Sequence, residues 1–243
     1  MSISSALVAA QGRVADAYTA ISNKGGTLPA TQNLANMPTA INSIPSGGST
    51  GKYQLLERIK DDSNNEIGTV SGFFTDANDV EYAVVCLDAQ YRLAQGTYCS
   101  NTSTAVTDLP VYSSWALWEA KETATFNTQK ILDFCTAQSA TSTACTHCRS
   151  KSFTIDGTTY YGQLPNVLEL VDICKNYVAI QSADTSVSQY SSLGFPRTSG
   201  RTWSSSQSGV RYGLNVSNDG VISGAYAKTN AFFVAPVLEL PNQ

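Results

Sequence analysis

Residues 203–240 read WSSSQSGVRYGLNVSNDGVISGAYAKTNAFFVAPVLEL, and this stretch decides the fold we expect. Apolar side chains alternate with other residues through 210–216. Successive side chains of a strand point to opposite faces, so the pattern predicts a half-buried strand with Arg211 and Asn215 on its solvent side. Asp219 and Gly220 suit the positive φ angles of a tight hairpin turn. We therefore expect a return strand that begins at Val221.

Periodicity predicts further strands and helices upstream of this hairpin. Strands are expected at 68–74 and 81–87, on either side of a turn at 76–79, and helical spacing marks 128–135 and 166–177. Helices that lie between early and late strands are typical of the α+β class. Residues 181–209 are rich in Ser, Gly and Thr and are predicted to form a long surface loop.

The N-terminal segment has a different pattern. Apolar residues are spaced by four and three positions, as in the seam of a coiled coil, at Ile3, Leu7, Ala10, Val14, Ala17 and Ile21. A Pro-Ser-Gly-Gly-Ser-Thr-Gly linker follows at 45–51. We expect residues 1–51 to be a helical docking or oligomerisation segment with its linker, and 52–243 to be one domain. The small alanines favour a homotrimer, and the alternative is a helix packed on its own domain.

The composition excludes several classes of function. Only 14% of residues are charged, the net charge is −4, and Lys and Arg do not cluster, so nucleic acid is not expected as a partner. Apolar runs are too short to cross a bilayer, so no membrane insertion is expected. The N-terminus lacks the basic flank of a signal peptide. These features predict a cytoplasmic protein or one that is assembled in the cytoplasm and released by lysis.

Six cysteines are dispersed along the chain, and two of them form the motif Cys145-Thr146-His147-Cys148. With Cys135 and Cys174 this motif could supply a zinc site, and its spacing also occurs in redox motifs. Neither alternative has the expected sequence context, so buried or disulfide-paired structural cysteines are favoured. No metal and no other cofactor is predicted.

Several motifs resemble the C-type-lectin-like domain of bacterial and phage surface proteins, which is related to the formylglycine-generating, sulfatase-modifying family. They are Asn127-Thr128 with Ile131, Cys148-Arg149, Leu164-Pro165 with Glu169-Leu170, Trp203-Ser204-Ser205, and Phe233-Val234 with Pro236-Val237. The resemblance implies an α+β, C-type-lectin-like fold that follows the N-terminal helical segment. In addition, 26–41 resembles N-terminal segments of tail and baseplate-associated proteins of tailed phages.

The resemblance does not extend to the activities of these families. Formylglycine-generating relatives use a cysteine pair near the end of the domain, whereas no cysteine follows Cys174. The triplets at 164–166 and 217–219 lack two of the oxygen ligands of calcium-dependent lectins. His147 is the only histidine, and it lies between two cysteines. We therefore expect neither an enzyme nor a metal-dependent lectin.

The C-terminal region is instead predicted to bind a ligand. Trp203 is expected in the core, and around it lie short polar and aromatic side chains of the kind that suits adaptable recognition. They are Ser206, Gln207, Ser208, Arg211, Tyr212, Asn215, Asn218, Tyr226, Lys228 and Asn230. The alternative is that these side chains only keep a weakly charged protein in solution.

Together, the motifs predict a phage virion protein of the tail fibre or baseplate. It would bind a bacterial cell-surface glycan or protein through the C-terminal domain and other tail subunits through residues 1–50. The first alternative is a purely structural tail component. A less favoured alternative is an enzyme related to the formylglycine-generating group.

Overall fold

The computed structural model describes residues 14–15, 17–19, 28–33, 35–37, 51–112, 120–189, 200–217 and 221–243. The chain divides into two compact units, Met1–Gly48 and Ser49–Gln243. In the first unit Tyr18 lies in a helical segment and is fully buried against Val14, Leu28 and Met37. Its hydroxyl donates a hydrogen bond to the Asn33 carbonyl at 2.7 Å. Of the predicted seam residues, Val14 and Ala17 are described, and the remaining four lie outside the described residues.

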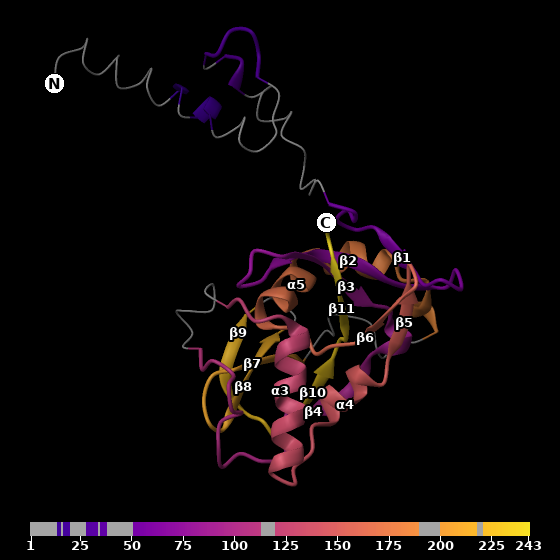
Figure 1. Ribbon diagram of the computed structural model, residues 1–243, viewed down its shortest axis with the longest axis vertical. Coiled ribbons are helices and arrows are strands. Elements are labelled where there is room, and N and C mark those ends of the chain that lie inside the picture. Colours follow the sequence, from indigo (N-terminus) through magenta and orange to yellow (C-terminus); the bar gives the residue numbers. More distant parts are fainter. Residues whose placement is uncertain are drawn as a thin grey trace, which may run out of the picture. The chain divides into compact units, whose positions relative to one another are not determined.

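The second unit contains strands and helices in mixed order (Figure 1). In chain order its described elements are β1 (Arg58–Lys60), β2 (Glu66–Thr75), β3 (Glu81–Leu87), η1 (Ala89–Tyr91), β4 (Leu93–Thr97), α3 (Ala124–Ala137), α4 (Thr143–Arg149), β5 (Ser152–Ile155), β6 (Thr158–Tyr161), α5 (Val167–Ala183), η3 (Thr185–Ser188), β7 (Arg201–Gln207), β8 (Tyr212–Ser217), β9 (Ile222–Ala227), β10 (Ala231–Val234) and β11 (Val237–Pro241). Helices together with several antiparallel sheets confirm the α+β class.

The strands form two larger sheets and one hairpin. The first sheet has the order β1-β2-β3-β11, the second has the order β4-β10-β7-β8-β9, and β5 pairs with β6. In the second sheet β10 and β7 run parallel, while the other pairs are antiparallel. Helix α5 packs on β2 of the first sheet and on β8 of the second. This helix therefore covers parts of both sheets.

Local sequence explains where the helices begin. The Asn166 side chain accepts hydrogen bonds from the backbone N–H groups of Leu168 and Glu169, and the Glu169 side chain accepts one from the Asn166 N–H. This capping box satisfies backbone N–H groups that a helix start otherwise leaves without partners. At the starts of α3 and α4, the Thr123 and Ser142 side chains each accept one hydrogen bond, from the backbone N–H of Phe126 and of Cys145. None of the described helices is long and apolar enough to cross a membrane.

Most predicted elements are present. The strands expected at 68–74 and 81–87 are β2 and β3, and the helices expected at 128–135 and 166–177 are the longer α3 and α5. The predicted C-terminal hairpin is the antiparallel pair β8 and β9. Its proposed turn, 218–220, lies outside the described residues.

The long surface loop predicted at 181–209 is wrong where the chain is described. Helix α5 continues to Ala183, η3 follows it, and β7 at 201–207 is almost completely buried. The serines of β7 can be buried because their hydroxyls are bonded. Ser204 donates to the Leu214 carbonyl at 2.9 Å and Ser205 to the Pro165 carbonyl at 3.2 Å. A high content of serine therefore does not show that a segment lies at the surface.

Trp203 lies in the core, as predicted. Its side chain is fully buried, and the indole N–H donates to the Asn230 carbonyl at 3.1 Å. The rings of Tyr98 and Phe232 lie against it, with centroid distances of 5.7 and 4.7 Å. This aromatic cluster joins β7 to β10 and to the segment after β4.

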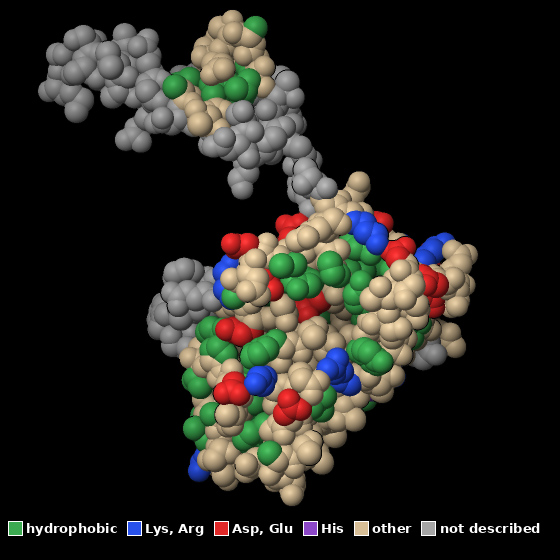
Figure 2. Space-filling model, viewed as in Figure 1, with side chains coloured by type: hydrophobic (Ala, Val, Ile, Leu, Met, Phe, Trp, Pro, Cys, Tyr) green, Lys and Arg blue, Asp and Glu red, His purple; other side chains and the backbone are tan. Residues whose placement is uncertain are grey.

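Charged side chains are sparse on the molecular surface. On the face shown in Figure 2 they form small separate groups, some with both signs of charge together, among hydrophobic side chains, other side chains and backbone. This distribution agrees with the charged fraction of 14% in the sequence.

Candidate ligand-binding site

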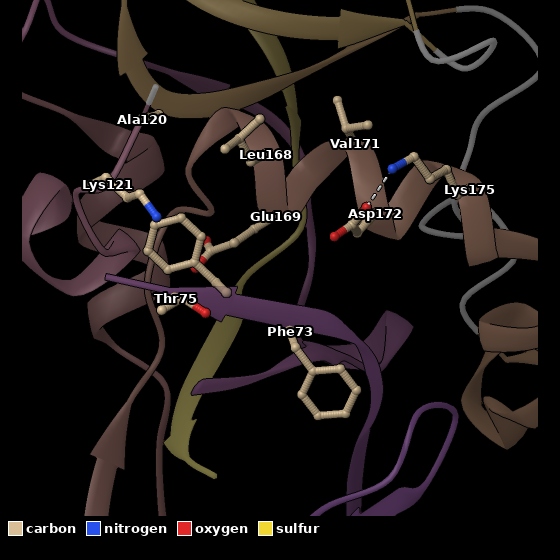
Figure 3. A pocket seen from close by; sticks show the side chains of 10 residues that line it. Phe73, Thr75, Ala120, Lys121, Leu168, Glu169, Val171, Asp172 and Lys175 are labelled. Atoms are coloured by element: carbon tan, nitrogen blue, oxygen red, sulfur yellow. Dashed lines mark hydrogen bonds and ion pairs between the residues drawn. The ribbon is translucent and has the colours of Figure 1, made fainter. Parts of the chain in front are cut away.

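A pocket of about 360 Å³ lies between the end of β2 and the first turns of α5 (Figure 3). Its walls combine apolar, acidic and basic side chains: Phe73, Phe74, Thr75, Ala120, Lys121, Leu168, Glu169, Val171, Asp172 and Lys175. This mixture of a partly apolar wall with a few charged groups is typical of small-ligand sites.

Close packing of α5 on β2 fixes the shape of the pocket. The Asn176 amide donates to the Ser71 carbonyl at 2.8 Å and so links helix to strand. A bulge interrupts β2 between Val70 and Gly72. A Cβ atom at Gly72 would lie only 2.9 Å from the Cβ of Asp172, so glycine is needed for the helix to approach.

Glu169, on the pocket wall, is almost completely buried. Its Oε2 accepts from the Asn166 N–H at 2.8 Å, whereas its Oε1 has no donor. Its carboxyl group lies close to that of Glu239 on β11. Burial first, and the negative charge of Glu239 second, raise the pKa of Glu169 well above its usual value.

Glu239 is in turn held by the start of α3. Its two carboxylate oxygens accept from the N–H groups of Ala124 and Thr125 at 2.6 and 2.8 Å. The raised pKa favours the protonated, uncharged form of Glu169 on the pocket wall.

The charges of the pocket lie nearer its rim. Figure 3 shows Lys121 and Lys175 at opposite ends, with Glu169 between them. Lys175 pairs with Asp172 at 2.7 Å, and both side chains are partly or largely exposed. Lys121 is exposed. The rim therefore carries two lysines and one acid, Asp172, which is paired with Lys175.

Another hollow, of about 460 Å³, borders α4. Hydroxyl side chains dominate its lining, which includes His147. Nε2 of this histidine lies 2.8 Å from the Tyr91 carbonyl, and burial lowers the pKa of the ring. The imidazole thus has a structural hydrogen bond to η1. We regard the pocket beside α5 as the candidate site because it combines apolar walls with charges of both signs.

Cys145 and Cys148 lie on α4, a short helix that the sequence analysis did not predict, and both are fully buried. Cys135 belongs to the same hydrophobic cluster, whereas Cys174 belongs to another. The four cysteines of the zinc alternative are therefore not gathered in one cluster. Among the residues that the structure covers, no group of three or more His, Cys, Asp or Glu side chains could hold a metal ion.

Four of the ten predicted ligand-binding residues are buried: Ser206, Gln207, Asn215 and Lys228. Asn215 accepts from the Arg201 guanidinium at 3.0 Å. The Lys228 ammonium donates to the Gln207 side chain at 3.0 Å and lies over the Tyr98 ring, and burial lowers the pKa of Lys228 to about 8. The Ser206 hydroxyl accepts from the Val167 N–H at 3.2 Å.

The predicted division of 210–216 into a core face and a solvent face holds for Arg211, Leu214 and Val216 and is wrong for the other three predicted residues. Asn215 is buried, whereas Val210 and Tyr212 are 46% and 41% exposed. Strand β8 lies between β7 and β9 in the sheet, and α5 packs against it. Because side chains on both faces of β8 are covered, the alternation of apolar and polar residues in its sequence does not predict which side chains are exposed.

Five other predicted residues are at least partly exposed, namely Ser208, Arg211, Tyr212, Tyr226 and Asn230, and we call them the sheet-end surface. Strand pairing brings several of them together, since Tyr212 lies opposite Ala227, and the Lys228 N–H donates to the Arg211 carbonyl at 2.9 Å. Asn218 lies outside the described residues.

Sequence reasoning did not identify the pocket. The Asn166-to-Glu169 spacing is a recognisable capping box and could have indicated the start of α5. The sequence does not indicate that Glu169 lies near Glu239, because a contact between residues so far apart in the chain depends on how the sheets assemble.

Comparison with known proteins gives one structural likeness. The chain is similar to the crystal structure of a fimbrial protein from Bacteroides ovatus ATCC 8483, with a TM-score of 0.54 and 12% sequence identity. The matched region covers 77% of this chain and 49% of that one, so the chain spans about half the length of its structural relative. No protein-family model and no curated protein matches the sequence. The similarity at this identity concerns the fold.

Proposed function

We propose that the chain is a binding module of an extracellular appendage and attaches to a bacterial cell surface through the pocket beside α5. The observation that carries this proposal is the pocket itself, which has a partly apolar wall, a buried Glu169 whose pKa is raised, and lysines at both ends. The fold likeness to a fimbrial protein supports an appendage. The motif resemblances favour a C-type-lectin-like domain in the virion of a tailed phage, as a tail fibre or baseplate protein.

The chemistry of the pocket favours an anionic glycan as the ligand. Lys121 and Lys175 can attract acidic groups, while a protonated Glu169 does not repel them. The apolar side chains of Phe74 and Leu168 can pack against the carbon face of a sugar ring. Such binding requires no chemical transformation, and we propose a non-catalytic role.

The test is binding of the fluorescently labelled full-length chain to bacterial cells and to immobilised acidic glycans. Replacement of both pocket lysines, Lys121→Ala with Lys175→Ala, should weaken binding at least tenfold, which corresponds to about 1.4 kcal/mol. Lys60→Ala, an exposed lysine on β1, is the matched control and should leave binding unchanged.

A second pair of variants tests the sheet-end surface as the alternative ligand site. Arg211→Ala with Tyr226→Ala should leave binding intact if the pocket is the site. Loss of binding in this pair alone would move the site to the sheet end. Absence of binding by the wild-type chain to every cell and glycan would favour a purely structural appendage component.

We also propose that residues 1–50 join the chain to other tail subunits or to copies of itself. The seam at 3–21 supports this assignment, because a short amphipathic helix is marginal in water unless its apolar stripe is covered. Sedimentation of the full-length chain should show an oligomer, a trimer in the simplest case. A chain without residues 1–50 should sediment as a monomer, and equal association states would contradict the proposal.

A further inference from the structure

Two cysteine thiols lie side by side in the core, away from the candidate pocket. Cys99 follows β4 and Cys135 lies in the last turn of α3. Their sulfur atoms are 3.5 Å apart, and the residues are 0% and 4% exposed. Both belong to the cluster around Trp203.

Backbone hydrogen bonds hold the two cysteines at this separation. The Ser100 N–H donates to the Thr141 carbonyl at 2.8 Å, and the Thr141 N–H returns a bond to the Ser100 hydroxyl at 2.8 Å. The Ala140 N–H donates to the Cys135 carbonyl at 2.8 Å. The segment after β4 is thereby fixed to the segment after α3. Approach of the sulfurs from 3.5 Å to the bonded distance of about 2.05 Å then requires mainly side-chain rotation.

The environment makes the two thiols chemically unequal. The hydrogen bond between the two thiols lowers the pKa of Cys99 to about 7 and raises that of Cys135. The Asn101 N–H and the positive charge of Lys228 act on Cys99 in the same direction. A thiolate is the reactive form of cysteine, so Cys99 is the nucleophile of the pair and Cys135 is its partner.

We propose that Cys99 and Cys135 form an intramolecular disulfide when the protein meets a small two-electron oxidant of the peroxide class. The Cys99 thiolate attacks a peroxide oxygen, the O–O bond breaks, and the hydroxide that leaves takes a proton to become water. Cys99 is now a sulfenic acid. The Cys135 sulfur attacks the Cys99 sulfur, the S–O bond breaks, and the leaving hydroxide takes the Cys135 proton. Two thiols and one hydrogen peroxide thus give one disulfide and two water molecules.

This bond would join β4 covalently to α3 through the Trp203 cluster. It would close the chain between Cys99 and Cys135 into a loop and restrict the unfolded ensemble. Reversible oxidation would therefore make stability respond to the redox environment outside a cell.

The test is oxidation of the folded, full-length chain with hydrogen peroxide, followed by peptide mapping without reduction. We expect a cross-linked peptide pair that contains Cys99 and Cys135, a loss of two hydrogens from the intact mass, and a melting temperature higher by roughly 10 °C. Addition of dithiothreitol should reverse all three changes. A different cysteine pair in the map, or two alkylatable thiols at 99 and 135 after oxidation, would overturn the proposal.

Matched variants separate this pair from its neighbours. Cys99→Ala and Cys135→Ala should each abolish the mass loss and the rise in melting temperature. Cys148→Ala removes another fully buried thiol of the same cluster and should leave both effects intact. Because the mapping is made on the wild-type chain, the proposal stays testable even if a variant fails to fold.

Discussion

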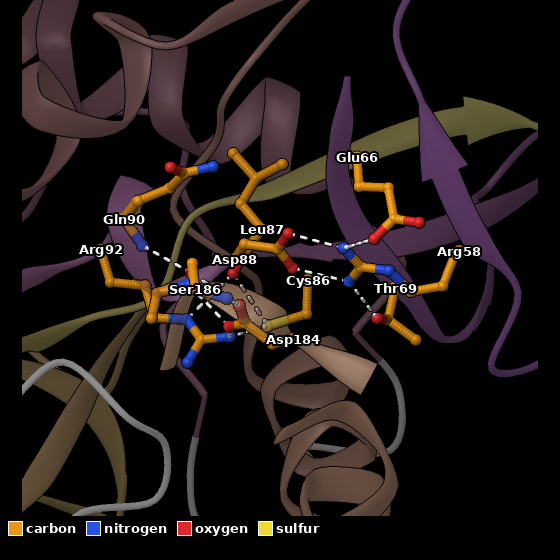
Figure 4. Close-up of polar contacts among 11 residues, drawn as sticks. Arg58, Glu66, Thr69, Cys86, Leu87, Asp88, Gln90, Arg92, Asp184 and Ser186 are labelled. Carbon is orange, nitrogen blue, oxygen red and sulfur yellow. Dashed lines mark hydrogen bonds and ion pairs between the residues drawn. The ribbon is translucent and has the colours of Figure 1, made fainter. Parts of the chain in front are cut away.

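Two buried clusters of charged side chains in the second unit solve the same physical problem in opposite ways. In the first cluster, Arg92 and Asp184 are completely buried, and their Nη2 and Oδ2 atoms lie 3.3 Å apart (Figure 4). In the second, Glu169 and Glu239 are buried together although both are acids. In the first cluster each charge faces an opposite charge. In the second, the raised pKa of Glu169 favours a protonated, uncharged acid beside Glu239.

Additional hydrogen bonds make the first cluster tolerable in a low-dielectric interior. Asp184 Oδ2 accepts from the Ala89 N–H at 2.7 Å, and Arg92 Nε donates to the Leu87 carbonyl at 2.9 Å. Nearby, Arg58 donates to both carboxylate oxygens of Asp88 at 2.7 Å. These contacts join η1 to η3 and β1 to the end of β3. An isolated buried charge would cost several kcal/mol, so each cluster depends on all its partners.

The difference between the clusters predicts different responses to pH. The carboxyl pair loses its proton as pH rises, and two adjacent negative charges then remain in the interior. We therefore expect mutation of the ion pair to cause the larger loss of stability. We expect the carboxyl pair to cause the larger loss of stability as the pH rises.

The largest effect is expected when the ion pair loses one member. Asp184→Ala should destabilise the fold by about 3–5 kcal/mol, because Arg92 is left buried without its counter-charge. Urea unfolding at neutral pH measures this loss. The double replacement Arg92→Leu with Asp184→Leu removes both charges and should recover much of it. A single variant as stable as the wild type would show that the pair contributes little.

A smaller, pH-dependent effect is expected at the carboxyl pair. The folded pKa of Glu169 is raised above its unfolded value of about 4.3, so the stabilisation is complete below that pH and is lost as pH rises through the raised pKa. Glu169→Gln supplies a permanent donor to Glu239. Relative to the wild type it should gain about 1–3 kcal/mol in unfolding free energy between about pH 4 and about pH 9.

Unfolding curves of Glu169→Gln and wild type at the two pH values measure this gain. Asp172→Asn, a change of a partly exposed acid on the same helix, is the control and should show a much smaller pH dependence. A constant difference between Glu169→Gln and wild type at both pH values would contradict proton sharing.

An effect of about 1 kcal/mol is expected from the helix cap beside the carboxyl pair. Asn166→Ala removes the acceptor for the N–H groups of Leu168 and Glu169. A loss of about 1 kcal/mol is the usual cost of removing an N-cap side chain. Asn166→Ser keeps an acceptor and should lose less. Both differences should be nearly independent of pH, because the cap does not titrate. A loss that grows with pH would mean that Asn166 acts mainly through Glu169.

The sequence predicted those parts of the fold that local periodicity determines. Strands β2 and β3 and helices α3 and α5 alternate or repeat with the period of their own structure, and each was found. Helix α4 was missed, because its sequence Thr-Ala-Cys-Thr-His-Cys-Arg is short and lacks an extended apolar period. The β7 serines were misassigned, because hydroxyl groups can be buried once they find backbone carbonyls.

The candidate site was harder to predict for the same reason. Asn215 and Lys228 have the polarity of surface residues, yet the structure places both in the interior with hydrogen-bond partners. The Glu169–Glu239 contact joins the start of α5 to β11, and only the three-dimensional arrangement brings them together. Polarity therefore predicts a need for partners better than it predicts exposure.

The smallest effect on stability is expected at the exposed ion pair on the pocket rim. Lys175 and Asp172 are three residues apart on α5, and the Lys175 side chain is 66% exposed. Water screens such a pair, and ordering two long side chains offsets much of the attraction, so Lys175→Ala should change stability by less than about 0.5 kcal/mol. Lys175→Arg keeps the charge and serves as the control. A loss of about 2 kcal/mol would show that this pair behaves like the buried Arg92–Asp184 pair.

The same two variants separate a role in stability from a role in binding. If stability is unchanged while binding of an acidic glycan falls in Lys175→Ala but not in Lys175→Arg, the charge acts on the ligand rather than on the fold.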